Sequence, residues 1–308
     1  MKPQPSFAIP FAVCCLGVAL FAVMDGTMKG LSLAIGLYNA LFWRALAGSV
    51  LGVALMLGMR RRWPTGAVLR LHLMRGTVVA FMAILFFWGL VRLPMAEAIA
   101  LSFVAPLIAL YLAALLLGER VGRRAIGASL LGLAGVGVIV AGRMRGDYDA
   151  QALLGAGAVL LSAVLFAWNL ILQRQQAQRA SPVEIACFQH FVMLALYALG
   201  APALAVVPPA DAVPLLVGAA LLAFASLAAF AWAYARAEAH RLIPVEYSAF
   251  PWSVIVGAVA FGEAVTLSTL AGAALIVAGC LVAARAGPKA GPPAHPPPSP
   301  PHVEAGAA

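Results

Sequence analysis

The chain has 308 residues, of which 64% are hydrophobic and only 10% are charged, and its formal net charge is +9. A soluble domain carries about a quarter charged residues, because polar groups must cover its surface. So little charge excludes a soluble fold and predicts an all-α polytopic membrane protein whose outside faces lipid.

Hydropathy predicts ten transmembrane helices, because ten apolar windows reach the roughly 20 residues that a bilayer core requires. The first window lacks a small-residue cleavage site and is followed by many further spans, so we expect a retained helix and no removed signal peptide. The windows cover residues 7–27, 35–57, 71–91, 95–117, 123–142, 152–173, 183–207, 213–235, 242–261 and 265–284.

The basic residues between these spans gather on one side of the membrane. With the N-terminus inside, the cytoplasmic segments hold fifteen lysines and arginines and the outer segments hold four, with Arg44 left inside a span. The positive-inside rule then places both termini in the cytoplasm, in a multi-pass protein of the cytoplasmic (inner) membrane. The basic charge is thus an orientation signal, and we expect no nucleic-acid partner.

Charges first interrupt the apolar pattern in spans one and two. Asp25 and Lys29 are four residues apart and share a helical face, so they could pair there, or Asp25 could bind substrate or a proton. Lys29 is expected nearer the lipid headgroups. A charge such as Arg44 costs about 2.5–3.5 kcal/mol inside a span, so it should face the bundle with Asp25 or Glu97 as its partner. Arg44 would then form a structural salt bridge or bind a substrate carboxylate.

Spans three and four add further polar groups and a proline. Arg75 begins span three on the inner side and is expected to anchor the helix at the interface. Glu97 lies in the first turn of span four, where it either complements the helix dipole or acts in an outer gate or in proton coupling. Proline frees a carbonyl one turn back, so Pro106, like Pro251 in span nine, predicts a helix kink along a transport path.

Aromatic and amide side chains within the spans could line a cavity, or could pack and anchor the helices. Asn169 lies deep in span six, where an amide needs a polar partner or water. His190 in span seven is more typical of a hydrogen-bonded histidine than of a proton relay. The candidates for a cavity are Trp88, Trp168, Asn169, Trp232 and Tyr247.

Two segments of the chain repeat one pattern, Arg92–Val140 and Arg241–Val282. Each opens with Arg-Leu, followed by a proline and a glutamate, and each has a mid-helix proline twelve or thirteen residues before a Gly-Glu turn. The paired positions are Pro94 and Pro244, Glu97 and Glu246, Pro106 and Pro251, and Glu119 and Glu263. Glu246 therefore shares the two roles considered for Glu97.

Two copies of five helices must be inverted relative to each other, because five is odd. Inverted repeats with broken helices are typical of secondary transporters, which hold substrate between the two halves. The predicted halves are residues 1–145 and 146–285. Residues 286–308 are so rich in proline that we expect a disordered cytoplasmic tail.

In their order and spacing, several short motifs resemble the EamA family of the drug/metabolite transporter superfamily, over about residues 7–285. The motifs are DGTMKGLS, FWRALAG, HLMRG, LPMAEAIALSFVAPLIAL with LGER, AWAYARAEAHRLIPVEY and FGE. The resemblance implies ten helices in two inverted five-helix halves, with a central cavity that gives a small metabolite alternating access to the two sides. It does not name the cargo.

We therefore expect a secondary active transporter, an exporter or an importer, of a small metabolite such as an amino acid or a related amphipathic compound. Asp25, Arg44 and Glu97 would form an outer polar cluster that binds substrate or gates the path, with proton coupling as one option. A larger cargo such as S-adenosylmethionine is the alternative. Lipid and a small-molecule substrate are the expected partners, and the oligomeric state stays open.

Other classes of function fit the sequence less well. An intramembrane enzyme would require a nucleophile with a base or metal ligands at helical spacing, and neither HExxH nor GxSxG occurs. The four cysteines show no metal or redox spacing, and without a P-loop we expect neither ATP-driven transport nor a cofactor. A channel would display a ring of like residues through oligomeric symmetry, which one sequence cannot show.

Overall fold

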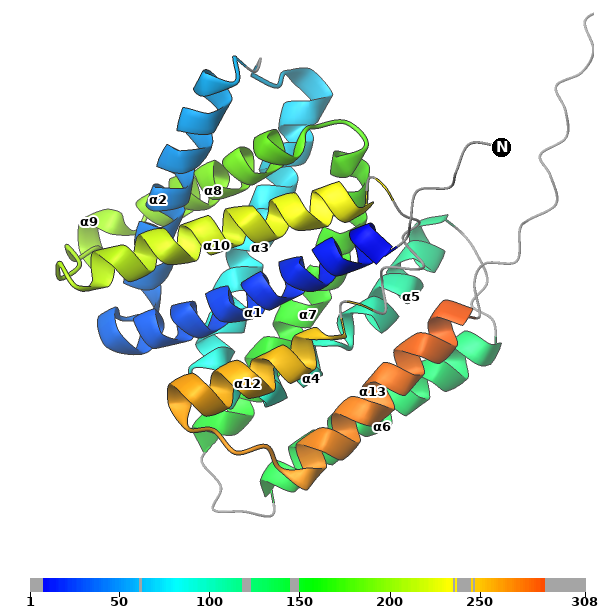
Figure 1. Ribbon diagram of the computed structural model, residues 1–308. Coiled ribbons are helices and arrows are strands. Elements are labelled where there is room, and N and C mark those ends of the chain that lie inside the picture. The colour runs from blue at the N-terminus through cyan, green and yellow to red at the C-terminus, as the bar shows by residue number, and fades with distance from the viewer. Residues whose placement is uncertain are drawn as a thin grey trace, which may run out of the picture.

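The computed structural model describes residues 8–60, 63–117, 123–144, 150–234, 236, 245 and 247–285. All regular elements within these ranges are α-helices, as the composition predicts (Figure 1). Five of them are long and apolar enough to cross a membrane. They are α1 (Ala8–Ile35), α2 (Leu37–Gly58), α3 (Gly66–Leu90), α7 (Ala150–Ala177) and α10 (Ala212–Tyr234).

The described ranges hold further helices, and several of these contain shorter apolar stretches. They are α4 (Met95–Ser102), α5 (Ala105–Leu117), α6 (Arg123–Met144), α8 (Pro182–Ala198), α9 (Ala201–Leu204), α12 (Ala249–Phe261) and α13 (Leu267–Arg285). Many large apolar side chains on these helices are exposed, among them Leu130, Leu133 and Val259. An apolar outside of this kind is what a protein surrounded by lipid requires.

Helix α1 is longer than the first predicted span. The apolar window ends near residue 27, but the helix continues to Ile35 and ends at Gly36, whose φ of 81° is unfavourable for residues with a side chain. Charged residues end a hydropathy window, yet they do not end a helix. Asp25 and Lys29 consequently lie inside α1 and not at its end.

Pro106 and Pro251 each lie in the first turn of a helix of 13 residues, α5 and α12. The span predicted at 95–117 is broken into α4 and α5 at Phe103 and Val104, just before Pro106. Proline lacks an N–H donor and is tolerated in a first turn, where that donor would have no partner. Pro251 is exposed. Whether either proline borders a transport path stays a prediction.

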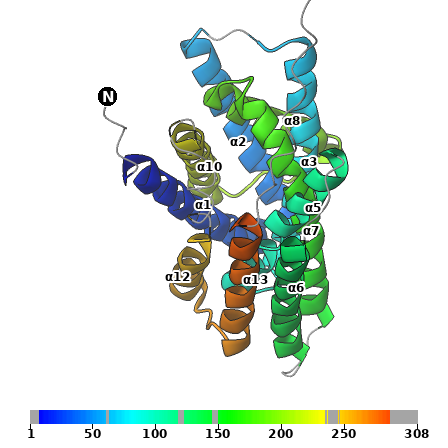
Figure 2. The same cartoon turned by 90° about the vertical axis from the view of Figure 1, so that its right-hand side faces the viewer.

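The helices pack in a few extended pairs. Helix α1 packs along α10, α3 along α7, and α2 along α8. Helices α6 and α13 form a further pair at one edge of the molecule, and they lie side by side in both views (Figures 1 and 2). The largest buried apolar cluster takes residues from α1 to α8, α10 and α13.

The α6–α13 pair depends on two glycines that face each other. A Cβ on Gly135 would lie 2.6 Å from the carbonyl oxygen of Gly272 and 2.7 Å from Ile276 Cγ1, whereas a Cβ on Gly137 would meet nothing within 4 Å. Small residues at such contacts let helix backbones approach closely in a membrane.

We therefore expect Gly135→Leu to lower the free energy of unfolding by about 1–3 kcal/mol, because the added side chain must push the two helices apart. Gly137→Leu, on the same helix, should change it little. Denaturant titration of the purified protein in detergent measures both. Equal stability of the two variants would contradict the close contact.

Candidate functional site

Two buried charges of opposite sign meet inside the bundle. Asp25 on α1 is 1% exposed, Arg44 on α2 is 5% exposed, and the two interact electrostatically. Asp25 Oδ2 and Arg44 Nε have no hydrogen-bond partner within the described ranges. The fold thus brings the charges together without closing a direct ion pair between them.

The surroundings of Arg44 leave much of its hydrogen-bonding capacity unused. Its Nη1 donates to Met24 Sδ at 3.6 Å, and its Cζ lies 5.8 Å from the centroid of the Phe87 ring. A thioether is a weak acceptor, an aromatic face attracts a cation only modestly, and a guanidinium has five N–H donors. Arg44 is therefore able to donate several hydrogen bonds to a ligand.

Helix α8 adds His190 and Tyr197, which are seven residues apart and so share one face. Both interact electrostatically with Arg44. His190 is buried and stacks on Phe224 of α10 at 5.5 Å between ring centroids, and its ring nitrogens have no hydrogen-bond partner among the described residues. The hydrogen-bond partner that we expected for this histidine is thus not among the described residues. We call Asp25, Arg44, His190 and Tyr197 the Asp25–Arg44 cluster.

Gly48 explains why His190 fits beside Arg44. A Cβ on Gly48 would lie 2.4 Å from His190 Nδ1, so the imidazole occupies the space that a side chain would need. Gly48 follows Arg44 by one helical turn and lies on the same face of α2. The absence of a side chain at this position thus lets α8 bring an imidazole close to the guanidinium.

A pocket of about 250 Å³ lies beside the cluster, between α2, α3 and α8. Tyr197 belongs to both the pocket and the Asp25–Arg44 cluster, and Leu41 of the pocket wall precedes Arg44 by one helical turn. The lining residues are Leu37, Tyr38, Leu41, Ile84, Leu196, Tyr197 and Gly200. An apolar pocket next to a few polar groups suits a ligand with a charged end and an apolar body.

A second charged contact joins α1 to both copies of the repeated pattern. Lys29 forms an ion pair with Glu263, and its Nζ also donates to the carbonyl oxygen of Leu93 at 2.6 Å. Glu263 Oε2 accepts from the backbone N–H of Met95, the first residue of α4, at 2.7 Å. The free N–H groups of a helix start favour such an anion. Lys29 is 5% exposed, so the expectation that it lies among lipid headgroups is wrong.

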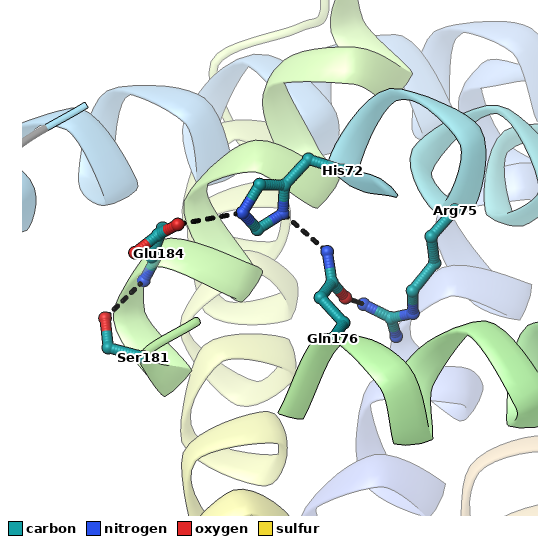
Figure 3. Close-up of polar contacts among 5 residues, drawn as sticks. All are labelled: His72, Arg75, Gln176, Ser181 and Glu184. Atoms are coloured by element: carbon teal, nitrogen blue, oxygen red, sulfur yellow. Dashed lines mark hydrogen bonds and ion pairs between the residues drawn. The ribbon is translucent and has the colours of Figure 1, made fainter. Parts of the chain in front are cut away.

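A third polar group surrounds Arg75 on α3. Arg75 is 3% exposed, so it is buried and is not the interface anchor that we expected. Its Nε donates to Asn169 Oδ1 at 2.9 Å and its Nη1 to Gln176 Oε1 at 2.8 Å. Gln176 also bonds to His72, which pairs with Glu184 at the start of α8 (Figure 3). Asn169 thus has the polar partner that its depth requires.

The predicted cavity tryptophans have other surroundings. Arg92 Cζ lies 3.5 Å from the centroid of the Trp88 ring, and Arg236 Cζ lies 4.1 Å from that of Trp232, so each ring is covered by the arginine four residues later. Trp168 is 46% exposed on α7. Tryptophan and arginine together are typical of helix ends at a membrane surface. A role for the three rings in a cavity stays a prediction.

The remaining predicted site residues lie around α4 and before α12. Tyr247 packs against Phe103 at the break between α4 and α5, with ring centroids 5.2 Å apart. Glu97 is buried in the first turn of α4. Glu246, Glu119 and the predicted tail 286–308 lie outside the described residues.

Sequence reasoning missed several members of these clusters. Gln173 and Gln176 follow Asn169 by four and seven residues, so a polar stripe on one face of α7 was readable from spacing alone. Tyr197 and Glu184 gave no such signal, because their partners come from distant helices. Within the described ranges, no three His, Cys, Asp or Glu side chains come close enough to hold a metal ion.

Comparison with known families and proteins finds similarity to transporters. The family model described as the EamA-like transporter family matches residues 8–141 and 153–285. The pseudopaline exporter CntI of Pseudomonas aeruginosa is 26% identical over 267 residues, which are 86% of this chain and 92% of that protein. The riboflavin transporter of Brucella anthropi is 24% identical over 246 residues, which are 78% and 85% of the two chains.

The fold also resembles that of solved structures. One crystal structure superposes with a TM-score of 0.58 and 22% sequence identity, covering 91% of this chain and 96% of the other. An identity this low supports a common fold and says nothing about the cargo.

Proposed function

Because the chain belongs to the EamA-like transporter family, we propose that it is a secondary active transporter that moves a small amphipathic metabolite across the cytoplasmic membrane by alternating access. Transporters of this family are multi-pass membrane proteins, and the chain is accordingly a transporter and not an enzyme. The observation that carries the specific proposal is the Asp25–Arg44 cluster, where buried polar atoms on α1, α2 and α8 lack protein partners.

The cluster offers a cation, a carboxylate and an imidazole to a ligand. Buried polar groups are nearly always hydrogen-bonded, so unpaired ones are costly unless a ligand or water completes them. Arg44 would bind a carboxylate with two parallel bonds, and Asp25 would accept from an amine. A compound with both groups, such as an amino acid or a derivative, matches this pair, and the adjacent apolar pocket would hold its side chain.

The proposed architecture is ten helices in two inverted halves, residues 1–145 and 146–285. The two separate matches of the family model support it, and so does the packing of the helices. When the two halves are exchanged in order, the α1–α10 contact becomes the α7–α3 contact, while α2–α8 and α6–α13 map onto themselves. Contacts related in this way are expected of a pseudo-two-fold axis between repeats.

We further propose that both termini are cytoplasmic in the inner membrane. The excess of lysine and arginine on one side supports this orientation. In it, α3 ends outside and α10 ends inside, so the Trp88–Arg92 and Trp232–Arg236 pairs lie at opposite membrane surfaces. Each pair would then anchor the end of its helix.

The names of the relatives leave the cargo and the direction open. One relative is named as an exporter of pseudopaline and another as a transporter of riboflavin. Export or import of an amphipathic metabolite is compatible with both, and S-adenosylmethionine remains the larger alternative.

The proposal is tested by untargeted metabolomics on cells and medium, comparing a strain that produces the protein with one that carries the empty vector. At least one metabolite should move across the membrane only in the producing strain, and its uptake by inside-out vesicles would give the direction. If no metabolite differs although the protein is in the membrane at a normal level, the transport function is wrong.

A further inference from the structure

Arg75 is a buried cation whose direct partners are all neutral. Its three hydrogen bonds go to amide oxygens on one face of α7, those of Asn169, Gln173 and Gln176, at 2.9, 3.4 and 2.8 Å. Within the described ranges no carboxylate touches it. A guanidinium is always charged, and a charge at such depth is favoured by a counter-ion. Two of its five N–H donors are not used by these three bonds.

The hydrogen bonds of this network run in one direction. Arg75 can only donate, so Gln176 turns its oxygen to Arg75 and its NH₂ group to His72, where it donates to Nδ1. Nδ1 therefore carries no proton, and Nε2–H of His72 donates to Glu184 Oε1 at 2.9 Å. Figure 3 shows this chain from Arg75 through Gln176 and His72 to Glu184. The geometry thus corresponds to a neutral His72.

A proton on Nδ1 of His72 would reverse the middle of the chain. The imidazolium donates from both nitrogens, so its Nδ1–H would face the NH₂ group of Gln176, donor against donor. Gln176 would have to turn its oxygen toward His72, and its NH₂ group would then face Arg75. The bond between Arg75 and Gln176 is therefore incompatible with a doubly protonated His72.

Protonation of His72 also changes the net charge of the network. With neutral His72, the charges of Arg75 and Glu184 sum to zero, and a proton on His72 raises the sum to one positive charge. Among the side chains that the structure describes, Cys187 on α8 is a further titratable neighbour, and it interacts electrostatically with Glu184. Protonation thus leaves Arg75 with a free N–H donor and the network with a charge that one anion neutralises.

From this geometry we infer that Arg75 is a binding site for a carboxylate group, and that a proton on His72 and the carboxylate on Arg75 bind together. A carboxylate accepts two parallel N–H bonds from a guanidinium, which replaces the lost bond to Gln176. The place of this site in a cycle rests on the proposed transport function, in which the carboxylate of the cargo would bind Arg75 together with one proton on His72. The binding itself does not depend on transport.

The inference is tested with formate, the smallest carboxylate, on the purified full chain in detergent, with formamide as the neutral control of the same shape. Histidine is the side chain most ready to gain a proton near neutral pH, so formate affinity is compared at about pH 6 and about pH 8. We expect formate to bind about tenfold more tightly at the lower pH, a typical size for coupled sites. By reciprocity, binding must take up protons, which a pH dye in weak buffer detects. Formamide should do neither.

Three variants separate the roles of the residues. Arg75→Gln should lose the formate binding that tightens at low pH, together with the linked proton uptake, and keep at most the pH-independent binding that Arg44 would supply. Gln176→Leu and His72→Gln should bind formate with equal affinity at both pH values, because the link between proton and anion is cut. If Arg75→Gln fails to fold, the pH dependence of formate binding by Gln176→Leu and His72→Gln still tests the inference. The inference is overturned if the wild type binds formate equally at both pH values, or if Gln176→Leu keeps the pH dependence. If linked formate binding is seen but no metabolite moves in the metabolomic test, the transport proposal is wrong and the site stands.

Discussion

Replacing Arg44 with alanine should lower transport of the cargo by about 30-fold or more, because removing one partner of a buried charged contact costs about 2–5 kcal/mol. The variant loses the cation that would bind the carboxylate, and it leaves Asp25 buried without the opposite charge. The measurement is the rate of cargo uptake into vesicles that contain equal amounts of wild-type and variant protein.

Two further variants make the result specific. Arg179→Ala removes an exposed arginine and should leave transport unchanged. Arg44→Lys keeps the charge but loses the planar fork that grips a carboxylate, so its rate should lie between those of wild type and alanine. Full transport by Arg44→Ala at a normal membrane level would remove Arg44 from the mechanism.

Replacing Glu263 with glutamine should lower the free energy of unfolding by about 3–5 kcal/mol, because it leaves the buried Lys29 ammonium without its counter-charge. The same change weakens the acceptor for the backbone N–H of Met95 at the start of α4. Denaturant titration in detergent measures the loss. Asp211→Asn, which removes an exposed carboxylate, is the matched control and should stay within about 0.5 kcal/mol of wild type.

The double variant Lys29→Met with Glu263→Gln should recover most of that loss, since it removes both buried charges and keeps an apolar side chain of similar length. A double variant as unstable as the single one would mean that Glu263 acts through its bond to α4 and that the ion pair adds little. Unchanged stability of Glu263→Gln would contradict the burial of Lys29.

Part of the candidate site could be predicted because some of its residues are charged or polar within otherwise apolar segments of the sequence. Arg44 stands out as a charge inside an apolar span, and Asp25 stands out at the end of one, so their meeting follows from the cost of leaving either in lipid. Asn169 stands out for the same reason. None of these arguments identifies a partner, because the cost of a buried polar group does not depend on which group relieves it.

The partners that were missed come from distant parts of the chain. Lys29 and Glu263 are 234 residues apart, and Arg75 and Gln176 are 101 apart. Lys29 and Arg75 each lie near the end of an apolar window, which predicts a place at the membrane surface. The helices in fact continue past those windows, and other helices cover the charged groups there.

The sequence by itself determined that this protein is an all-helical membrane protein of a transporter family, because the cost of exposing polar groups to lipid acts on every residue of a span and leaves a long, continuous pattern. Only the tertiary structure decided which buried charges meet. That choice depends on helix rotation and on close contacts such as Gly48 against His190, which are set by packing between segments far apart in the chain.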